Sequence, residues 1–248
     1  MGEFNINPVH NVHKQYRQVN FVNPYIFTPP VVNTLLNGLI AYYPLDSNSN
    51  DLKNAYNGAN TNISYVASGI GNGASFNGSS SFISVADQND FSFTNGTNDT
   101  PFSIGFGIKL NTVSGYRDII SKRTVGSFEW EIRMNGASLE VVLGDPSESY
   151  FLYKISGQTL DINTYYKIII TFSSGTILIY LNNIDVGGVT QNLGGYVKMT
   201  NTTAPVCFGK SGTNIFYFNG IIDDVCIWNR VLPSTERTDN YNRITNLL

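Results

Sequence analysis

Two adjacent carboxylates, Asp223 and Asp224, stand in the middle of the apolar stretch GIIDDVCIW (220–228). Acidic residues are depleted in β-strands, so their presence there needs a reason. One reason is ligation of a hard cation such as calcium, which takes carboxylate, carbonyl and water oxygens. Because neighbouring strand residues point to opposite faces, one ion is expected to contact only one of the two acids. The alternative is a solvated pair that decorates the edge of a sheet.

A second group of charged residues alternates along FEWEIRM (128–134), where Glu129 and Glu131 share one face. Retaining hydrolysis of a glycosidic bond needs two carboxyl groups about 5 Å apart. The next position on that face is Arg133, which breaks the acidic series. The alternative is that these three residues decorate an outer face.

Residues suited to sugar binding occur in the segments GYRD (115–118), DPSESYF (145–151) and GTNIFYF (213–219). A sugar site combines aromatic surfaces with a few planar polar side chains that fix orientation. The carbohydrate-binding candidates are Tyr116, Arg117, Tyr150 and Tyr217. Because the chain is 13% aromatic, the alternative for each ring is a place in the core.

The overall composition excludes several classes of partner. The 248-residue chain has a net charge of −3 and only 13% charged residues, whereas nucleic-acid binding needs a basic face. No apolar run is long enough to span a membrane. Cys207 and Cys226 are too few for a disulfide framework, so we expect two small buried residues, with a single bridge as the alternative. His10 and His13 have no acidic or cysteine partner at the spacing of a metal site or a triad.

Strict alternation of apolar and polar residues predicts two of the strands that position these groups. In FSIGFGIKL (102–110) the apolar residues share one face, which is typical of a half-buried strand. FEWEIRM is expected to point Phe128, Trp130, Ile132 and Met134 inward. SLEVVLG (138–144) follows across Asn135-Gly136, a strong hairpin signal.

Short apolar segments separated by turn residues predict the remaining strands. They are LIAYYPL (39–45), SFNGSSSFISV (75–85) around an NGSS turn, YYKIIITFSSGTILIYLNNIDVGG (165–188), VCFG (206–209) and GIIDDVCIW. A helix is expected to start near Pro233, because Ser234, Thr235 and Glu236 suit a first turn. Short strands at regular spacing predict an all-β sandwich or barrel.

Residues 1–37 differ in composition from the rest of the chain. Pro24, Pro29 and Pro30 exclude a continuous helix or a central strand. Aromatic residues are frequent there, unlike in a disordered tail. We expect an extended, ordered N-terminal arm that docks on a neighbouring subunit or, as the alternative, packs on its own domain. Residues 38–248 are expected to form a single domain.

Five stretches of the chain carry a resemblance to a known family. They are GLIAYYPLD (38–46), GNGASFNGSSSFISV (71–85), DIISKR (118–123), YYKIIITFSSGTILIYLNNIDVG (165–187) and FNGIIDDVCIWNRVLPSTE (218–236). In this order they resemble the laminin-G-like, concanavalin-A-like lectin/glucanase family, in which the second stretch forms a hairpin. The resemblance covers residues 38–245. It implies an all-β, two-sheet antiparallel jelly-roll sandwich with one short C-terminal helix.

The resemblance also implies that the first and last strands lie side by side, which brings Asp46 near Asp223. Many members of the family hold a calcium ion there through carboxylates and main-chain carbonyls. We therefore expect one structural Ca²⁺ with Asp46 and Asp223 as ligands, and with Asp51 and carbonyls near Gly78 and Ser80 as further oxygens. The alternative is that Asp46 and Asp51 cap turns. Glucanases of this fold carry three alternating acids on one strand, and this chain has Arg133 in place of the third. The resemblance therefore implies that Glu129, Glu131 and Arg133 decorate an outer face, and we expect no catalytic residue and no enzyme.

Together these features predict a non-catalytic structural or adhesion protein. The arm, the neutral polar surface and the lack of a recognisable secretory signal favour a virion surface component, such as a bacteriophage decoration, fibre or tail protein. Residues 1–37 would then dock on other subunits of an oligomeric assembly, at the virion surface or outside the cell, with a cell-surface glycan as a further partner. The alternative is a free or cell-surface carbohydrate-binding lectin module. A weaker alternative is a polysaccharide-degrading enzyme.

Overall fold

The computed structural model describes residues 33–212 and 216–248. The chain divides into two compact units, Met1–Asn33 and Thr34–Leu248, and the second contains every element described below. Most of the expected arm, residues 1–32, therefore lies outside the described residues. The last residues of the expected arm include the 3-10 helix η1 (Thr34–Leu36), in which Leu35 is buried.

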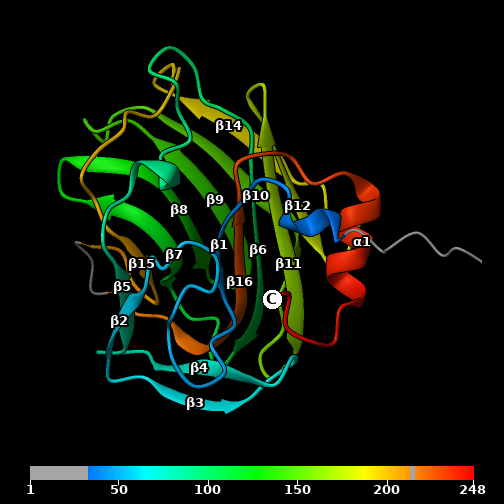
Figure 1. Ribbon diagram of the computed structural model, residues 1–248. Coiled ribbons are helices and arrows are strands. Elements are labelled where there is room, and N and C mark those ends of the chain that lie inside the picture. Colours follow the sequence, from blue (N-terminus) through cyan, green and yellow to red (C-terminus); the bar gives the residue numbers. More distant parts are fainter. Residues whose placement is uncertain (1–32, 213–215) are drawn as a thin grey trace, which may run out of the picture. The chain divides into compact units, whose positions relative to one another are not determined.

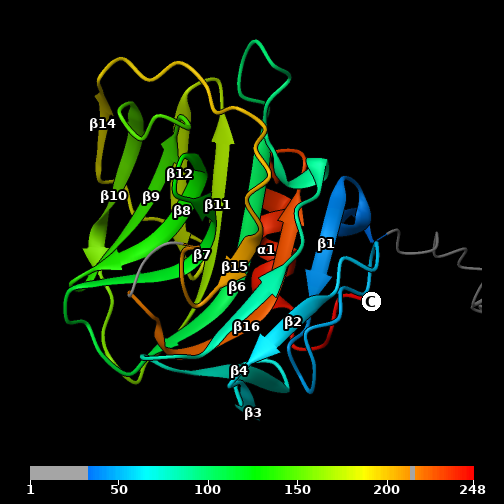
Figure 2. The same cartoon turned by 90° about the vertical axis from the view of Figure 1, so that its left-hand side faces the viewer.

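Two antiparallel sheets of eight strands form the second unit (Figures 1 and 2). Sheet A has the order β13 (Ile184–Asp185), β12 (Thr176–Leu181), β11 (Tyr165–Ser173), β6 (Phe102–Leu110), β16 (Asn219–Trp228), β4 (Asn72–Asn77) and β3 (Ser64–Ala67), with β1 (Leu39–Tyr43) also on β16. Sheet B has the order β14 (Val189–Leu193), β10 (Phe151–Thr159), β9 (Ser138–Gly144), β8 (Ser127–Asn135), β7 (Tyr116–Thr124), β15 (Val206–Phe208), β5 (Phe82–Val85) and β2 (Gly58–Thr61). The expected two-sheet jelly roll is confirmed.

The first and last strands lie side by side, as the resemblance implied. β1 runs antiparallel to β16 in a register that places Tyr42 opposite Cys226 and Tyr43 opposite Val225. All five residues of β1 are buried. Since β16 also pairs with β6 and β4, it is a central strand of sheet A. The closing strand therefore joins the beginning and the middle of the chain into one sheet.

The prediction of a hairpin within residues 75–85 is wrong. β4 belongs to sheet A and β5 to sheet B, so the NGSS turn carries the chain from one sheet to the other. The Asn77 side chain organises this turn, because its Oδ1 accepts the amides of Ser79, Ser80 and Ser81 at 3.0, 2.9 and 3.1 Å. An Asx turn of this kind reverses the chain, and the two strands that it joins need not pair with each other.

Strand β6 is buried on both faces, whereas alternation predicted a half-buried strand. Its small residues face a second apolar layer outside sheet A. Ser103 donates through Oγ to the Arg230 carbonyl at 2.8 Å, and a Cβ on Gly105 would lie 3.2 Å from the Trp228 ring. The face of β6 that carries serine and glycine is thus covered by Trp228 and the C-terminal segment.

This second layer is a separate apolar cluster on the outside of sheet A. Its buried members are Leu35, Leu39, Tyr42, Ile169, Tyr180, Cys226, Trp228, Leu232 and Leu247. The indole Nε1 of Trp228 donates to the Leu35 carbonyl at 2.7 Å. Helix α1 (Ser234–Asn242) lies on this side of the sandwich and begins directly after Pro233, as predicted (Figure 1).

Strand β8 alternates as expected from Trp130 onward but not before it. Trp130, Ile132 and Met134 belong to the main core between the sheets, and Phe128 does not. The register with β7 shifts between Lys122 and Arg123, which leaves Glu129 as an extra residue. Such a β-bulge breaks the two-residue period.

Two smaller expectations are also resolved. Cys207 and Cys226 are both free and buried, which favours the interpretation of two small core residues over a bridge. Within the described part of the chain, no helix is long and apolar enough to cross a membrane.

Candidate functional site

The outer face of sheet B carries a line of alternating charges, here called the charge ladder: Glu148, Arg123, Glu131, Arg133 and Glu140. Successive members form ion pairs of 2.8, 3.1, 3.4 and 2.8 Å. The Glu131 side chain is only 1% exposed, because both arginines bind to it. Guanidinium groups also stack on rings, and that of Arg123 lies 4.6 Å from the centroid of Phe128.

The prediction that Glu129, Glu131 and Arg133 decorate an outer face is wrong for Glu129, whereas Glu131 and Arg133 do lie on the outer face of sheet B. The bulge places Glu129 in a fully buried ion pair with Lys122, at 2.9 Å. Glu131 lies beneath its arginine partners, and burial followed by the charge of Asp118 raises its pKa to about 8. Buried carboxylates of this kind are paired and hydrogen-bonded rather than free to react.

Three of the four predicted sugar-binding residues lie together at one end of β7. The Tyr116 ring is 39% exposed and lies 4.8 Å from the Arg133 guanidinium. Arg117 donates through Nη1 to the Tyr116 carbonyl at 2.7 Å. Tyr217 forms a parallel bridge with Asp118. This group therefore borders the charge ladder.

The fourth predicted residue, Tyr150, lies at the opposite end of sheet B, in the loop between β9 and β10. Its side chain is exposed. A Cβ on Gly194 would lie 2.5 Å from its ring, so Tyr150 packs against the segment that follows β14. The structure consequently does not bring Tyr150 together with the other three candidates.

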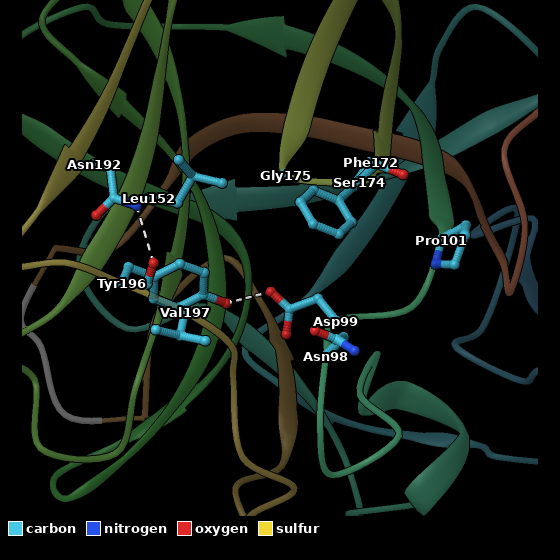
Figure 3. Close-up of a pocket in the computed structure, with 10 residues that line it drawn as sticks. All are labelled: Asn98, Asp99, Pro101, Leu152, Phe172, Ser174, Gly175, Asn192, Tyr196 and Val197. Carbon is cyan, nitrogen blue, oxygen red and sulfur yellow. Dashed lines mark hydrogen bonds between the residues drawn. The ribbon is translucent and has the colours of Figure 1, made fainter.

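A cavity of about 390 Å³, here called the end pocket, lies at one end of the sandwich, beside the turn Ser174–Gly175 between β11 and β12 (Figure 3). Its lining residues are Asn98, Asp99, Pro101, Leu152, Phe172, Ser174, Gly175, Asn192, Tyr196 and Val197. Strands β10 and β14 of sheet B supply Leu152 and Asn192, and β11 of sheet A supplies Phe172. Its volume lies in the range of roughly 300–1,000 Å³ that is typical of small-molecule sites.

Hydrogen bonds hold the polar groups of the end pocket in place. Asp99 accepts the Tyr196 hydroxyl at 2.6 Å (Figure 3), and it also accepts the Met199 amide at 2.7 Å. Asn192 donates through Nδ2 to the Tyr196 carbonyl at 2.9 Å. Burial raises the pKa of Asp99, although both of its hydrogen bonds oppose the change. Burial and the charge of Asp99 raise the pKa of Tyr196, so its hydroxyl stays a proton donor.

The end pocket was not predicted from the sequence. Asp99 stands in TNGTNDTPF, a segment whose composition indicates only turns. Its partner Tyr196 is 97 residues further along the chain. No local spacing connects the two, because the pairing depends on how loops from both sheets meet at the end of the sandwich.

The two expected calcium ligands flank the same short segment. Asp46 Oδ1 accepts the Asn72 amide at 2.8 Å, and Asp223 Oδ2 accepts the Ile70 amide at 3.1 Å. Burial raises the pKa of Asp223 to about 6. Asp46 also accepts the Asn246 side-chain amide through Oδ2 at 2.7 Å, so both of its oxygens already have protein donors. Among residues 33–212 and 216–248, no three His, Cys, Asp or Glu side chains are grouped as a metal site.

Asp51 and Asp224 have structural partners. Asp51 accepts the amides of Tyr42 at 2.8 Å, Lys53 at 2.9 Å and Asn54 at 3.0 Å, which is the turn-capping arrangement weighed as the alternative. Asp224 forms a buried, two-pronged ion pair with the Arg243 guanidinium. The adjacent acids of β16 thus serve different partners.

The sequence matches a known family over more than half of its length. Residues 77–236 fit a laminin-G-type family model described as the Concanavalin A-like lectin/glucanases superfamily. Among curated protein sequences, none matches this chain significantly.

Several solved structures share the fold at low sequence identity. The binding domain of Paraclostridial Mosquitocidal Protein 1 has a TM-score of 0.69 at 17% identity, covering 84% of this chain and 52% of that one. The binding domain of Botulinum Neurotoxin DC in complex with SialylT has a TM-score of 0.63 at 17% identity, covering 85% and 52%. This chain thus spans about half the length of these toxin domains.

A third structure matches over nearly its whole length. Domain 4 of AbnA, a GH43 extracellular arabinanase from Geobacillus stearothermophilus, in complex with arabinotriose, has a TM-score of 0.62 at 16% identity. The match covers 81% of this chain and 97% of that one. At identities this low, all three likenesses establish the jelly-roll fold and leave function to be argued from the site.

Proposed function

Because the chain belongs to the concanavalin A-like lectin/glucanases superfamily, we propose that it is a non-catalytic carbohydrate-binding module whose binding site is the end pocket. The observation that carries this proposal is the combination of size and chemistry in that pocket. One fixed carboxylate, two side-chain amides and two hydroxyls line the pocket together with the apolar side chains of Phe172 and Leu152. Convergent polar groups above apolar surface are the usual composition of a small-molecule site.

The geometry of sheet B supports a role without catalysis. Retaining glycosidases hold two carboxyl groups about 5 Å apart around the scissile bond. Here the bulge removes Glu129 from the outer face, and two arginines engage Glu131. In the end pocket, Asp99 is the single carboxyl group among the lining residues. Neither place offers the pair of accessible carboxyl groups that hydrolysis requires.

Two of the similar structures contain glycans, which favours a carbohydrate over other small molecules. Domain 4 of AbnA was solved with arabinotriose and the Botulinum Neurotoxin DC binding domain with SialylT. We carry over only the ligand class, and we place the site from the residues of this chain.

A glycan array followed by titration calorimetry tests the proposal. The full chain is expected to bind at least one oligosaccharide, and the variant Asn192→Ala to bind it about fivefold to tenfold more weakly, as for one lost hydrogen bond. The matched control is Asn60→Ala, an exposed edge-strand asparagine that also donates one side-chain hydrogen bond. Loss of binding in Tyr116→Ala but not in Asn192→Ala would place the site on the outer face of sheet B instead.

The place of the module on a virion surface, docked through residues 1–37, stays a prediction from composition. Residues 1–32 lie outside the described residues, and the comparisons concern the jelly roll. We expect the full chain to co-purify with phage particles. The chain without residues 1–32 should no longer co-purify with them. A full chain that never associates with particles would contradict it.

Calcium ligation by Asp46 and Asp223 likewise stays a proposal. The buried Asp223 Oδ1 has no hydrogen-bond partner, which fits a missing ligand, whereas the donors on Asp46 fit a turn cap. An ion that binds only the folded state must raise the melting temperature. We expect a higher Tm in millimolar calcium than in EDTA for the wild type and not for Asp223→Asn. Equal values in the wild type would reject the site.

A further inference from the structure

We propose that the end pocket selects neutral sugars and rejects sugar units that carry a carboxylate. This inference rests on the proposed function and names the ligand class of the same site. It depends on the charges that line the pocket and on how firmly they are held.

The lining of the end pocket contains one anion and no cation. Asp99 is the charged member, and none of the other nine residues is Lys, Arg or His. Recognition of an anionic ligand in proteins normally relies on arginine or lysine, or on backbone amides at a helix N-terminus. The pocket walls come from strands and loops, so neither device is present among the lining residues.

Asp99 cannot move aside for a second anion. The Tyr196 hydroxyl binds one carboxylate oxygen and the Met199 amide binds the other. The group is also partly desolvated, which raises its pKa. In a medium of reduced dielectric constant, two like charges repel more strongly than in water. A uronate or sialate carboxylate beside Asp99 is therefore disfavoured.

Lys198 follows the lining residue Val197 in the chain and is not itself among the residues that line the pocket. Its ammonium donates to the Gly96 carbonyl, on an exposed loop. Its effect on the pKa of Asp99 is smaller than those of burial and of the two hydrogen bonds. Asp145 adds a further negative charge on the side of Tyr196. The residues that line the pocket thus carry a single negative charge.

A neutral sugar satisfies the same groups. An ionised carboxylate accepts only, so Asp99 suits two hydroxyl donors of a sugar. The amides of Asn98 and Asn192 and the hydroxyl of Ser174 can both donate and accept. The apolar side chains of Phe172 and Leu152 suit the C–H face of a pyranose or furanose ring.

The test uses an array in which each neutral glycoside stands beside its uronate, with one hydroxymethyl group replaced by a carboxylate, followed by calorimetry on the full chain. We expect neutral ligands to bind and their uronates to bind about tenfold more weakly or worse. Uronates that bind as tightly as their neutral counterparts would overturn this inference and leave the proposed function intact. An array without any bound glycan would overturn the proposed function itself, and this inference with it.

Two variants connect the selectivity to the pocket. Val197 lines the rim and is 76% exposed, so Val197→Lys adds a cation without disturbing the core. This variant should reduce the ratio of neutral-sugar affinity to uronate affinity to about threefold or less. The control Val125→Lys, at an 81% exposed site outside the pocket, should leave that ratio unchanged. Asp99→Asn should also reduce this ratio of affinities, as Val197→Lys does. Ratios unchanged in both pocket variants would contradict the inference.

Discussion

Glu131 is a carboxyl group on the outer face of a sheet that nevertheless has almost no access to water. Burial, followed by the charge of Asp118, raises its pKa from an ordinary value of 4.5 to about 8. Between these values the folded state binds a proton that the unfolded state releases, so the contribution of Glu131 to stability falls as the pH rises. Below about pH 4.5 that contribution is fully present.

The variant Glu131→Gln removes this titration while it keeps the size of the side chain. The free energy of unfolding of the wild type should fall between about pH 4.5 and 8 through this group, and that of the variant should fall less. Urea unfolding at closely spaced pH values measures the difference. Glu148→Gln, which removes the ion pair at the more exposed end of the charge ladder, is the control for the loss of one ion pair. Identical slopes for Glu131→Gln and the wild type would contradict the assignment.

Single residues could be predicted from the sequence only where their role is local. Asp51 sits in a polar turn and binds amides within a few residues of itself, so its capping role was one of the two alternatives. Asp99 and Tyr196 meet across 97 residues, and Glu129 meets Lys122 only because a bulge turns it. Contacts of this kind depend on tertiary packing, which composition and spacing do not encode.

At the scale of elements, the bulge in β16 explains the pair of acids in its middle. The register with β6 shifts between Asp223 and Cys226, and Asp224 adopts a left-handed backbone with a φ of 55°. Aspartate tolerates this conformation better than most residues. The irregularity lets Asp223 bind the Ile70 amide and the Tyr165 hydroxyl while Asp224 reaches a different partner, Arg243.

Removal of Arg243 should therefore be costly. Both side chains of the Asp224–Arg243 pair are 9% exposed, so Arg243→Ala leaves a buried carboxylate without its partner and should lower the free energy of unfolding by about 3 kcal/mol. The double variant Asp224→Asn/Arg243→Ala should lose less free energy of unfolding than Arg243→Ala, because it leaves no unpaired charge buried. Denaturant unfolding of both variants gives the comparison, and an equal loss in both would exclude the ion pair as the cause.

The strands themselves were predictable and their irregularities were not. Period-two alternation located β6 and most of β8, and Asn135-Gly136 marked the turn between β8 and β9. The exchange of sheets after β4 and the burial of both faces of β6 were missed. Pairing partners and covering layers are long-range properties, whereas alternation reports only that one face is apolar.

At the scale of the whole molecule, the order of motifs was sufficient for the architecture because the jelly roll requires its first and last strands to pair. The boundary at its start is less sharp than the composition indicated. Residues 34–37 were assigned to the arm, yet η1 supplies Leu35 to the outer apolar cluster and its carbonyl to Trp228. Arg230 also donates to the carbonyls of Asn37 at 2.6 Å and Thr34 at 3.0 Å.

Two truncations distinguish these segments. Deletion of residues 1–32 should leave the melting temperature nearly unchanged, because the described members of both apolar clusters belong to the second unit. Deletion of residues 1–37 should lower it by several degrees, because a buried indole donor loses its acceptor and Leu35 leaves its cluster. Calorimetric melting of both truncated chains provides the test. A large loss with the shorter deletion would show that residues 1–32 contribute to the core.

The end pocket takes its walls from both layers of the sandwich, with Leu152 and Asn192 on one side and Phe172 on the other. A ligand held there would contact both layers at one end of the sandwich. Force applied through the ligand would then load both sheets together as shear, instead of peeling one edge strand from its neighbour. Occupancy would in that way strengthen the domain mechanically in the direction in which an attached glycan pulls.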